Sequence, residues 1–200
     1  MPLLPGSREV YTAYFVLLRG DACSLKEDSP QLQVIMNRAL VLACGSALRG
    51  DDGVALHLAS CLRNGLCDPD TQIHFDQQWT PELAEAISGA ELVIFLDASA
   101  SLEPGQIRCQ VLRPIFQSRA SVTHHMSPAT LLSLAESLYG TYPERAYLLT
   151  IGGASFELRE GLSEPVRKAI PQAIERIKAL LSGVTRPEEW IHPNQATNGL

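Results

Sequence analysis

The sequence lacks both a basic cluster and a long apolar segment. Its 16 basic and 22 acidic residues give a formal net charge of −6 at pH 7. Binding to a phosphate backbone needs clustered Lys and Arg side chains, which are missing here. The longest apolar run near the N-terminus, residues 13–18, is too short to span a membrane and is followed by Arg19 rather than by a small-residue cleavage site. We therefore expect no nucleic-acid partner, no membrane insertion and no secretion signal.

Cysteine is scarce and irregularly spaced. An odd number of cysteines without any Cys-x-x-Cys pair argues against a disulfide framework and against a zinc knuckle. The five are Cys23, Cys44, Cys61, Cys67 and Cys109. We expect reduced thiols in a cytoplasmic protein, with Cys44 packed as a small hydrophobe inside an apolar run.

Several signatures of common enzymes are also missing. The sequence contains no Gly-x-Gly-x-x-Gly after its first predicted strand, no Gly-x-x-x-x-Gly-Lys-Ser/Thr, no His-Glu-x-x-His and no Gly-x-Ser-x-Gly. These absences argue against a Rossmann dinucleotide site, a P-loop, a zincin metalloprotease and an α/β-hydrolase nucleophile elbow.

What the sequence does contain is an alternation of short apolar runs and amphipathic stripes. Strands are predicted at residues 39–44, 72–75, 92–97, 107–112 and 147–151. Helices are predicted to follow Gly53, Thr80-Pro81, Ser127-Pro128 and Ser163, and Pro171 should kink or divide the last one. This pattern predicts a single three-layer α/β domain with a mostly parallel, five-stranded twisted sheet and helices on both faces.

The domain is predicted to occupy only part of the chain. Two hundred residues suit one domain. Residues 1–35 show no clear period and are expected to form an N-terminal extension. The compact domain is expected over residues 36–183, and residues 184–200 form a loose C-terminal tail.

Two adjacent acids follow the first predicted strand. Asp51 and Asp52 stand between Gly50 and Gly53, where a strand passes to a helix. A carboxylate there either caps the helix or faces the crevice above the strand ends, where open α/β sheets place their chemistry. We assign the cap to Asp51 and the crevice to Asp52.

A third acid and a histidine pair are predicted at the same edge of the sheet. Asp97 ends the apolar strand at residues 92–97, and burial of an unpaired carboxylate there would be costly, so it either faces a polar crevice or has a structural hydrogen-bonding role. His124 and His125 occupy the loop before Ser127. Two carboxylates and one imidazole make a candidate three-ligand site for a divalent transition metal.

The chain resembles the hydrogenase maturation peptidases over about residues 38–182. Four segments carry the resemblance, and all four occur in the family's order: residues 45–53 (Gly-Ser-Ala-Leu-Arg-Gly-Asp-Asp-Gly), 95–98 (Phe-Leu-Asp-Ala), 123–128 (Thr-His-His-Met-Ser-Pro) and 162–166 (Leu-Ser-Glu-Pro-Val). One departure from the family pattern is Ser46, which stands where Asn is usual and removes two N–H donors.

The resemblance implies a phosphorylase/hydrolase-like fold and an aspartic-type endopeptidase that trims the C-terminus of a nickel-iron hydrogenase large-subunit precursor after nickel insertion, and so activates the hydrogenase. It places the catalytic and metal-contacting roles on Asp52, Asp97 and His124, with His125 as the alternative to His124. The nickel would be carried by the substrate, and zinc or cadmium-like ions would substitute in vitro.

Two alternatives remain open at this point. A self-contained zinc hydrolase would use the same three side chains. A non-cleaving adaptor or chaperone of hydrogenase assembly would keep the crevice without cutting, because a fold does not fix an activity. We expect a monomer that binds the precursor.

Overall fold

The computed structural model describes residues 37–65, 70–115 and 126–183. The predicted N-terminal extension at residues 1–35 and the predicted tail at residues 184–200 lie outside these ranges, so both boundaries stay predictions. No helix within the described ranges is long and apolar enough to cross a membrane.

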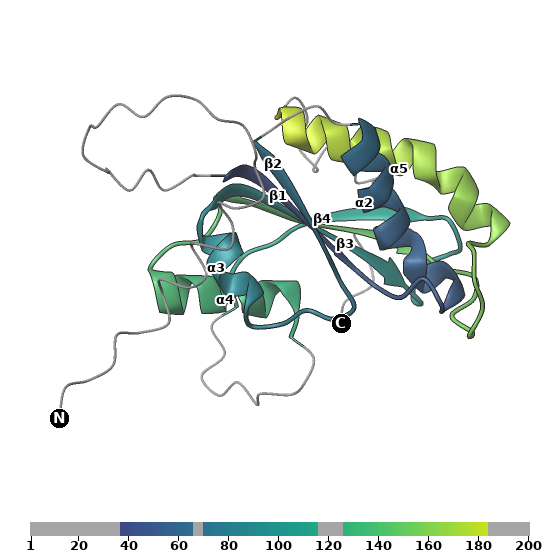
Figure 1. The fold of residues 1–200 in the computed structure, drawn as a ribbon, viewed down its shortest axis with the longest axis horizontal. Coiled ribbons are helices and arrows are strands. Elements are labelled where there is room, and N and C mark those ends of the chain that lie inside the picture. Colours follow the sequence, from purple (N-terminus) through teal and green to yellow (C-terminus); the bar gives the residue numbers. More distant parts are fainter. Residues whose placement is uncertain (1–36, 66–69, 116–125, 184–200) are drawn as a thin grey trace, which may run out of the picture. The chain divides into compact units, whose positions relative to one another are not determined.

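Strands and helices alternate along most of the chain (Figure 1). The strands are β1 (Asn37–Cys44), β2 (Thr71–Asp76), β3 (Ala90–Ser99), β4 (Ile107–Val111) and β5 (Arg145–Gly152). The helices are η1, a short 3-10 turn (Gly50–Gly53), α2 (Val54–Gly65), α3 (Leu83–Ser88), α4 (Pro128–Tyr139) and α5 (Glu164–Ser182). Each predicted strand is confirmed, with ends that differ by at most two residues.

The five strands form one sheet in the order β2-β1-β3-β5-β4. Strands β1, β2, β3 and β5 are parallel, whereas β4 at the edge runs antiparallel to β5. The predicted fold class, a mostly parallel five-stranded sheet in a three-layer α/β domain, is confirmed.

Strand β3 lies between two apolar cores, one on each face of the sheet. Leu92, Ile94 and Leu96 pack into the core that α2 and α5 cover. Val93 and Phe95 point the other way, into the core that α3 and α4 cover (Figure 1). All five side chains are fully buried. Burial on both faces explains why this strand is apolar at every position instead of alternating.

Two helix predictions need correction, and one is confirmed. Helix α3 begins at Leu83 rather than at Thr80-Pro81, because the Thr80 carbonyl accepts from the Leu83 N–H at 3.2 Å and closes a turn before the helix. Helix α5 continues through Pro171 without dividing, so the predicted division is wrong and the alternative, a kink, stays a prediction. Pro171 is exposed, and the backbone carbonyl that it leaves without a donor can be hydrated. Ser127 caps α4 as predicted, accepting the Thr130 N–H at 3.1 Å.

Asp51 has a different structural role from the predicted helix cap. It lies inside η1, is 1% exposed, and caps no helix through its side chain. Its carboxylate instead accepts three backbone N–H groups of the β5–α5 loop, from Ala154 at 2.8 Å, Ser155 at 3.1 Å and Ser163 at 2.6 Å. We call these three hydrogen bonds the Asp51 clamp. The clamp joins the turn after β1 to a loop about a hundred residues later.

The three hydrogen bonds of the Asp51 clamp keep the carboxylate of Asp51 ionised. Burial alone would raise the pKa of Asp51, but the hydrogen bonds from Ser163, Ala154 and Ser155 outweigh it and hold the pKa below its usual range. The turn also depends on Gly50, whose φ of +57° is left-handed and whose missing Cβ would lie 2.8 Å from the Ser155 oxygen. The two loops therefore meet closely, backbone against backbone.

We predict that Asp51→Asn lowers the free energy of unfolding by about 2–4 kcal/mol, because an amide offers one acceptor oxygen and turns an NH₂ group towards backbone donors. Urea unfolding at neutral pH measures this loss. The stabilisation by the carboxylate is present above the unfolded pKa of 3.8 and is lost as pH falls through the lower folded pKa.

The neighbouring substitution Asp52→Asn is the matched control for this prediction. Asp52 is half-buried and outside the clamp, so its loss should cost less than about 1 kcal/mol. Equal destabilisation by the two substitutions would contradict the structural role given to Asp51.

Candidate active site

The carboxyl ends of β1 and β3 meet where the chain reverses its direction across the sheet. From β1 the chain passes through α2 to β2 on one side, and from β2 it passes through α3 to β3 on the other side of β1. Such a switch point opens a crevice outside the strand ends, and ligands of open α/β folds bind there. Asp52 follows β1 and Asp97 lies near the end of β3, so both predicted acids belong to this edge.

Asp52 is held by a tight loop that begins where β1 ends. Its Oδ2 accepts the backbone N–H of Ser46 at 2.9 Å, and its own N–H donates to the Arg49 carbonyl at 3.2 Å. Gly45 makes the turn possible, because its φ is +147° and a Cβ there would collide with the Asp52 carbonyl. The backbone of residues 45–52 therefore fixes the position of the carboxylate.

Asp97 is largely withdrawn from water beside Asp52. Its Oδ1 accepts the backbone N–H of Ala98 at 2.8 Å, and the Trp79 side chain hydrogen-bonds to the same carboxyl group. Burial raises the pKa of Asp97 to about 6, and the charge of Asp52 adds to the rise, while the hydrogen bonds from Ala98 and Trp79 oppose it. Mutual repulsion between two carboxylates in a desolvated crevice favours a proton or a cation between them.

Trp79 and Asp76 are site residues that sequence reasoning missed. Trp79 is buried after β2 and meets the Phe95 ring edge-on, with ring centroids 5.3 Å apart. Asp76 ends β2 in register with Cys44, much as Asp97 follows the buried part of β3. That shared pattern, an acid after a strand, was a signal for Asp76, whereas no sequence feature tied Trp79 to Asp97.

Cys44 is buried as predicted, but it lies among acids. Burial raises the pKa of the Cys44 thiol to about 12, and the charges of Asp97, Asp52 and Asp76 add to the rise. The thiol therefore stays protonated at neutral pH. The three acids make the crevice strongly negative around this position, which favours a cationic ligand.

Only part of the predicted ligand set falls in the described residues. Asp52 and Asp97 are brought together, whereas His124 and His125 lie within residues 116–125, outside the described ranges. Among the side chains that are described, no three His, Cys, Asp or Glu residues form a group that could hold a metal ion. A complete metal site would therefore need a ligand from elsewhere in the chain or from a bound substrate.

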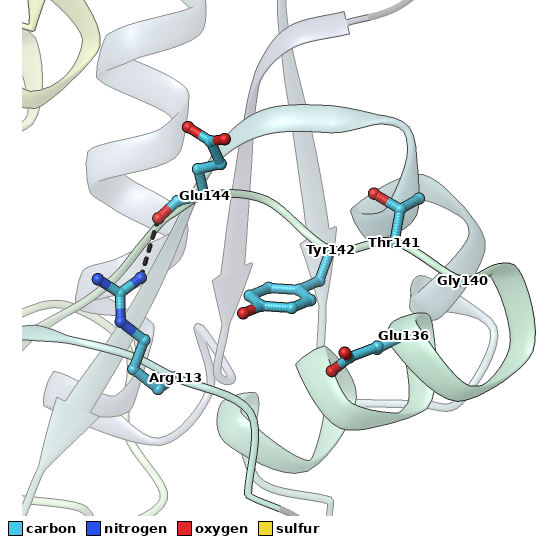
Figure 2. A pocket seen from close by; sticks show the side chains of 6 residues that line it. All are labelled: Arg113, Glu136, Gly140, Thr141, Tyr142 and Glu144. Atoms are coloured by element: carbon cyan, nitrogen blue, oxygen red, sulfur yellow. Dashed lines mark hydrogen bonds between the residues drawn. The ribbon is translucent and has the colours of Figure 1, made fainter.

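A separate pocket lies away from these acids, near the amino ends of the parallel strands. It has a volume of about 520 Å³ and is lined by Arg113, Glu136, Gly140, Thr141, Tyr142 and Glu144. Figure 2 shows the Tyr142 ring between the Arg113 and Glu136 side chains, with Arg113 donating to the Glu144 carbonyl at 3.0 Å. Gly140 to Glu144 precede β5, whereas the acid pair follows or ends strands. The pocket and the acid pair therefore lie at opposite ends of the parallel strands.

We predict that Asp97→Asn raises the melting temperature relative to wild type more at about pH 7.5 than at about pH 4.5. Between the unfolded pKa of 3.8 and the folded value of about 6, Asp97 binds more protons in the native state, so its contribution to wild-type stability falls as pH rises. The neutral amide does not incur this cost. Thermal melts of both proteins at the two pH values measure the difference.

Glu91→Gln is the control for the loss of one negative charge, because Glu91 is an exposed acid on the same strand. A stability difference between Asp97→Asn and wild type that does not change with pH would contradict the desolvated setting of Asp97.

Comparison with solved structures gives the fold a clear set of relatives. The hydrogenase maturating endopeptidase HybD from E. coli matches with a TM-score of 0.60 and 23% identity, over 74% of this chain and 93% of that one. The hydrogenase 2 maturation peptidase from a Thaumarchaeota archaeon matches with a TM-score of 0.54 and 25% identity, over 72% and 98%. The [NiFe] hydrogenase maturation protease HycI from Thermococcus kodakarensis matches with a TM-score of 0.56 and 23% identity, over 73% and 93%. No curated protein matches the chain.

A family model also matches the sequence itself. The model described as hydrogenase maturation protease, HycI, matches residues 78–180, which is just over half of the chain and includes Asp97 and Trp79. Asp52 and its loop precede the matched segment. The chain therefore belongs to the hydrogenase maturation protease family and is an endopeptidase, a hydrolase, of that family.

Proposed function

We propose that this enzyme removes the C-terminal peptide of a nickel-iron hydrogenase large-subunit precursor once nickel has been inserted. The family acts on such precursors. What supports the metal-dependent step is the placement of Asp52 and Asp97 together at the switch point of the sheet, where the charge of one raises the pKa of the other. This acid pair is the single observation on which the proposal depends most.

The acid pair suits a cation that arrives with the substrate. Asp52 uses one oxygen, Oδ2, for Ser46, and Asp97 uses Oδ1 for Ala98. Carboxylate oxygens are hard donors of the kind that divalent metals accept, and an ion there would share the Asp97 carboxyl with the Trp79 side chain. We propose that Asp52, Asp97 and His124, or His125 in its place, contact nickel held by the precursor, so that recognition depends on nickel insertion. Zinc or cadmium-like ions would occupy the same positions in vitro.

The chemistry proposed for this site is hydrolysis of one peptide bond. A metal ion beside the acid pair would either polarise the scissile carbonyl or lower the pKa of an attacking water. The protein's own part is to hold the two carboxylates rigidly, through the Ser46 and Ala98 N–H groups and the Trp79 side chain. Preorganised groups of this kind contribute to rate because they need no rearrangement during the reaction.

Membership of a peptidase family favours cleavage over the non-cleaving adaptor, which otherwise would share the fold. We further propose that the enzyme acts as a cytoplasmic monomer. The acidic net charge of −6 is consistent with a protein substrate and gives no reason to expect nucleic acid.

We predict that Asp52→Asn and His124→Ala each reduce processing of a nickel-loaded precursor by at least about 100-fold while leaving the melting temperature nearly unchanged. Each substitution removes a proposed contact to the substrate-borne metal. Incubation of full-length enzyme with precursor, followed by mass spectrometry of the large subunit, measures processing.

The same assay tests the order of events when it uses precursor prepared without nickel. Wild-type enzyme should shorten the nickel-loaded precursor and leave the nickel-free one intact. The parallel variant His125→Ala decides between the two histidines. Stable association without shortening, in wild type and in Asp97→Ala alike, would favour the adaptor and overturn the proposal.

A further inference from the structure

Two leucines project into solvent from segments that lie far apart in the sequence. Leu158, in the loop between β5 and α5, is 86% exposed, and Leu48, in the loop after β1, is 56% exposed. Exposed single leucines are ordinary on protein surfaces, so the two leucines matter only if they form one contiguous apolar surface.

A short backbone pairing holds the two leucines in place. Arg49 and Arg159 form a parallel β-bridge, in which the Gly50 N–H donates to the Arg159 carbonyl at 2.8 Å and the Arg159 N–H donates to the Leu48 carbonyl at 2.9 Å. In this register Leu48 and Leu158 each precede a bridge residue and stand opposite one another. We call Leu48 and Leu158 together the leucine pair.

A second set of hydrogen bonds joins the two loops that carry the leucine pair. The Asp51 clamp joins the same two segments through Ala154, Ser155 and Ser163. Both loops appear together at the lower right of Figure 1, where α2 starts and the chain enters α5. A surface that is preorganised in this way loses little conformational entropy when a partner covers it.

The leucine pair borders the acid site. Leu48 belongs to the hydrogen-bonded loop that carries Asp52, because the Arg49 N–H donates to the Ser46 carbonyl at 3.1 Å and the Ser46 N–H donates to the Asp52 carboxylate. A molecule that covers Leu48 therefore rests on the same short hydrogen-bonded loop that carries Asp52. A second copy of the chain seated there would block access to the acids, whereas a protein substrate would be guided towards them.

The charges around the leucine pair cancel. Arg49 and Arg159 are exposed beside it, and so are Glu157 and Glu160. Two positive and two negative side chains leave no net sign to select an acidic or a basic partner. The chemistry that recognises this surface is therefore apolar contact, with little dependence on salt.

We propose that the leucine pair docks an apolar segment of the hydrogenase large-subunit precursor beside Asp52. The identity of the occupant rests on the proposed function, in which the precursor is the substrate. The docking surface itself rests on the exposure of Leu48 and Leu158 and on the rigid pairing of their two loops.

The test measures binding and cleavage of the nickel-loaded precursor by full-length enzyme. In an Asp97→Ala background, which should leave the precursor uncut although one proposed nickel contact is lost, Leu158→Ser should weaken the Kd about tenfold relative to that parent, and the double variant with Leu48→Ser about 100-fold. In the otherwise wild-type enzyme the same substitutions should raise KM by similar factors and leave kcat within about twofold.

Leu138→Ser is the matched control, since Leu138 is 63% exposed on α4 and lies towards the opposite edge of the sheet. It should change neither the Kd nor KM. Thermal melts and sedimentation of every variant accompany the binding data, to show that fold and oligomeric state are preserved.

The possible results separate the docking surface from the proposed function. If wild type cleaves but the double variant binds as tightly as its parent, the docking surface is wrong. If wild type does not cleave and the leucine variants still lose affinity, docking stands and the cleavage proposal falls. If the variants dissociate a dimer without changing the Kd, the leucine pair covers a second copy and the inference is overturned.

Discussion

The buried carboxylate of Asp51 accepts three backbone N–H groups and so joins the turn that carries Asp52 to the β5–α5 loop. The dipoles of the Ala154, Ser155 and Ser163 amides stabilise the charge of Asp51. Such charge-assisted hydrogen bonds are roughly twice as strong as neutral ones. Because they connect the turn after β1 to the entry of α5, the position of the Asp52 loop depends on a loop more than a hundred residues away.

Asp51 and Asp52 are adjacent acids with opposite physical roles. One is buried, satisfied by amides and held ionised, and the other is half-buried at the crevice, where its Oδ2 accepts the Ser46 N–H. The 3-10 turn Gly50–Gly53 produces this division, since consecutive side chains on a tight turn point in different directions. A structural acid and a site acid therefore share one short segment, and the rigidity of the first fixes the placement of the second.

The crevice combines negative charge with poor access to water. Asp97 and Cys44 both have raised pKa values, in each case through burial first and neighbouring carboxylates second. Such a site is costly when empty and ionised, and a bound cation would relieve the cost. The crevice is charged, whereas the leucine pair is apolar. Metal recognition and the docking of a protein partner would therefore rely on separate physical interactions.

The sequence by itself determined the fold class and the placement of Asp52 and Asp97 at the same end of the strands, because strand burial and the residues that start or stop helices are local signals. The apolar run before Asp97, the Ser127 cap and the Gly140 stop each act within a few residues, and each was predicted correctly. Only the tertiary structure decided the partners of Asp51, the hydrogen bond between Trp79 and Asp97, and the pairing of Leu48 with Leu158. These contacts join residues that are far apart in the chain. The hydrophobic periodicity of a sequence is a local property and does not predict which distant loops come into contact. Their positions follow from the strand order and the crossovers, which place the β1 and β5 loops at one edge of the sheet.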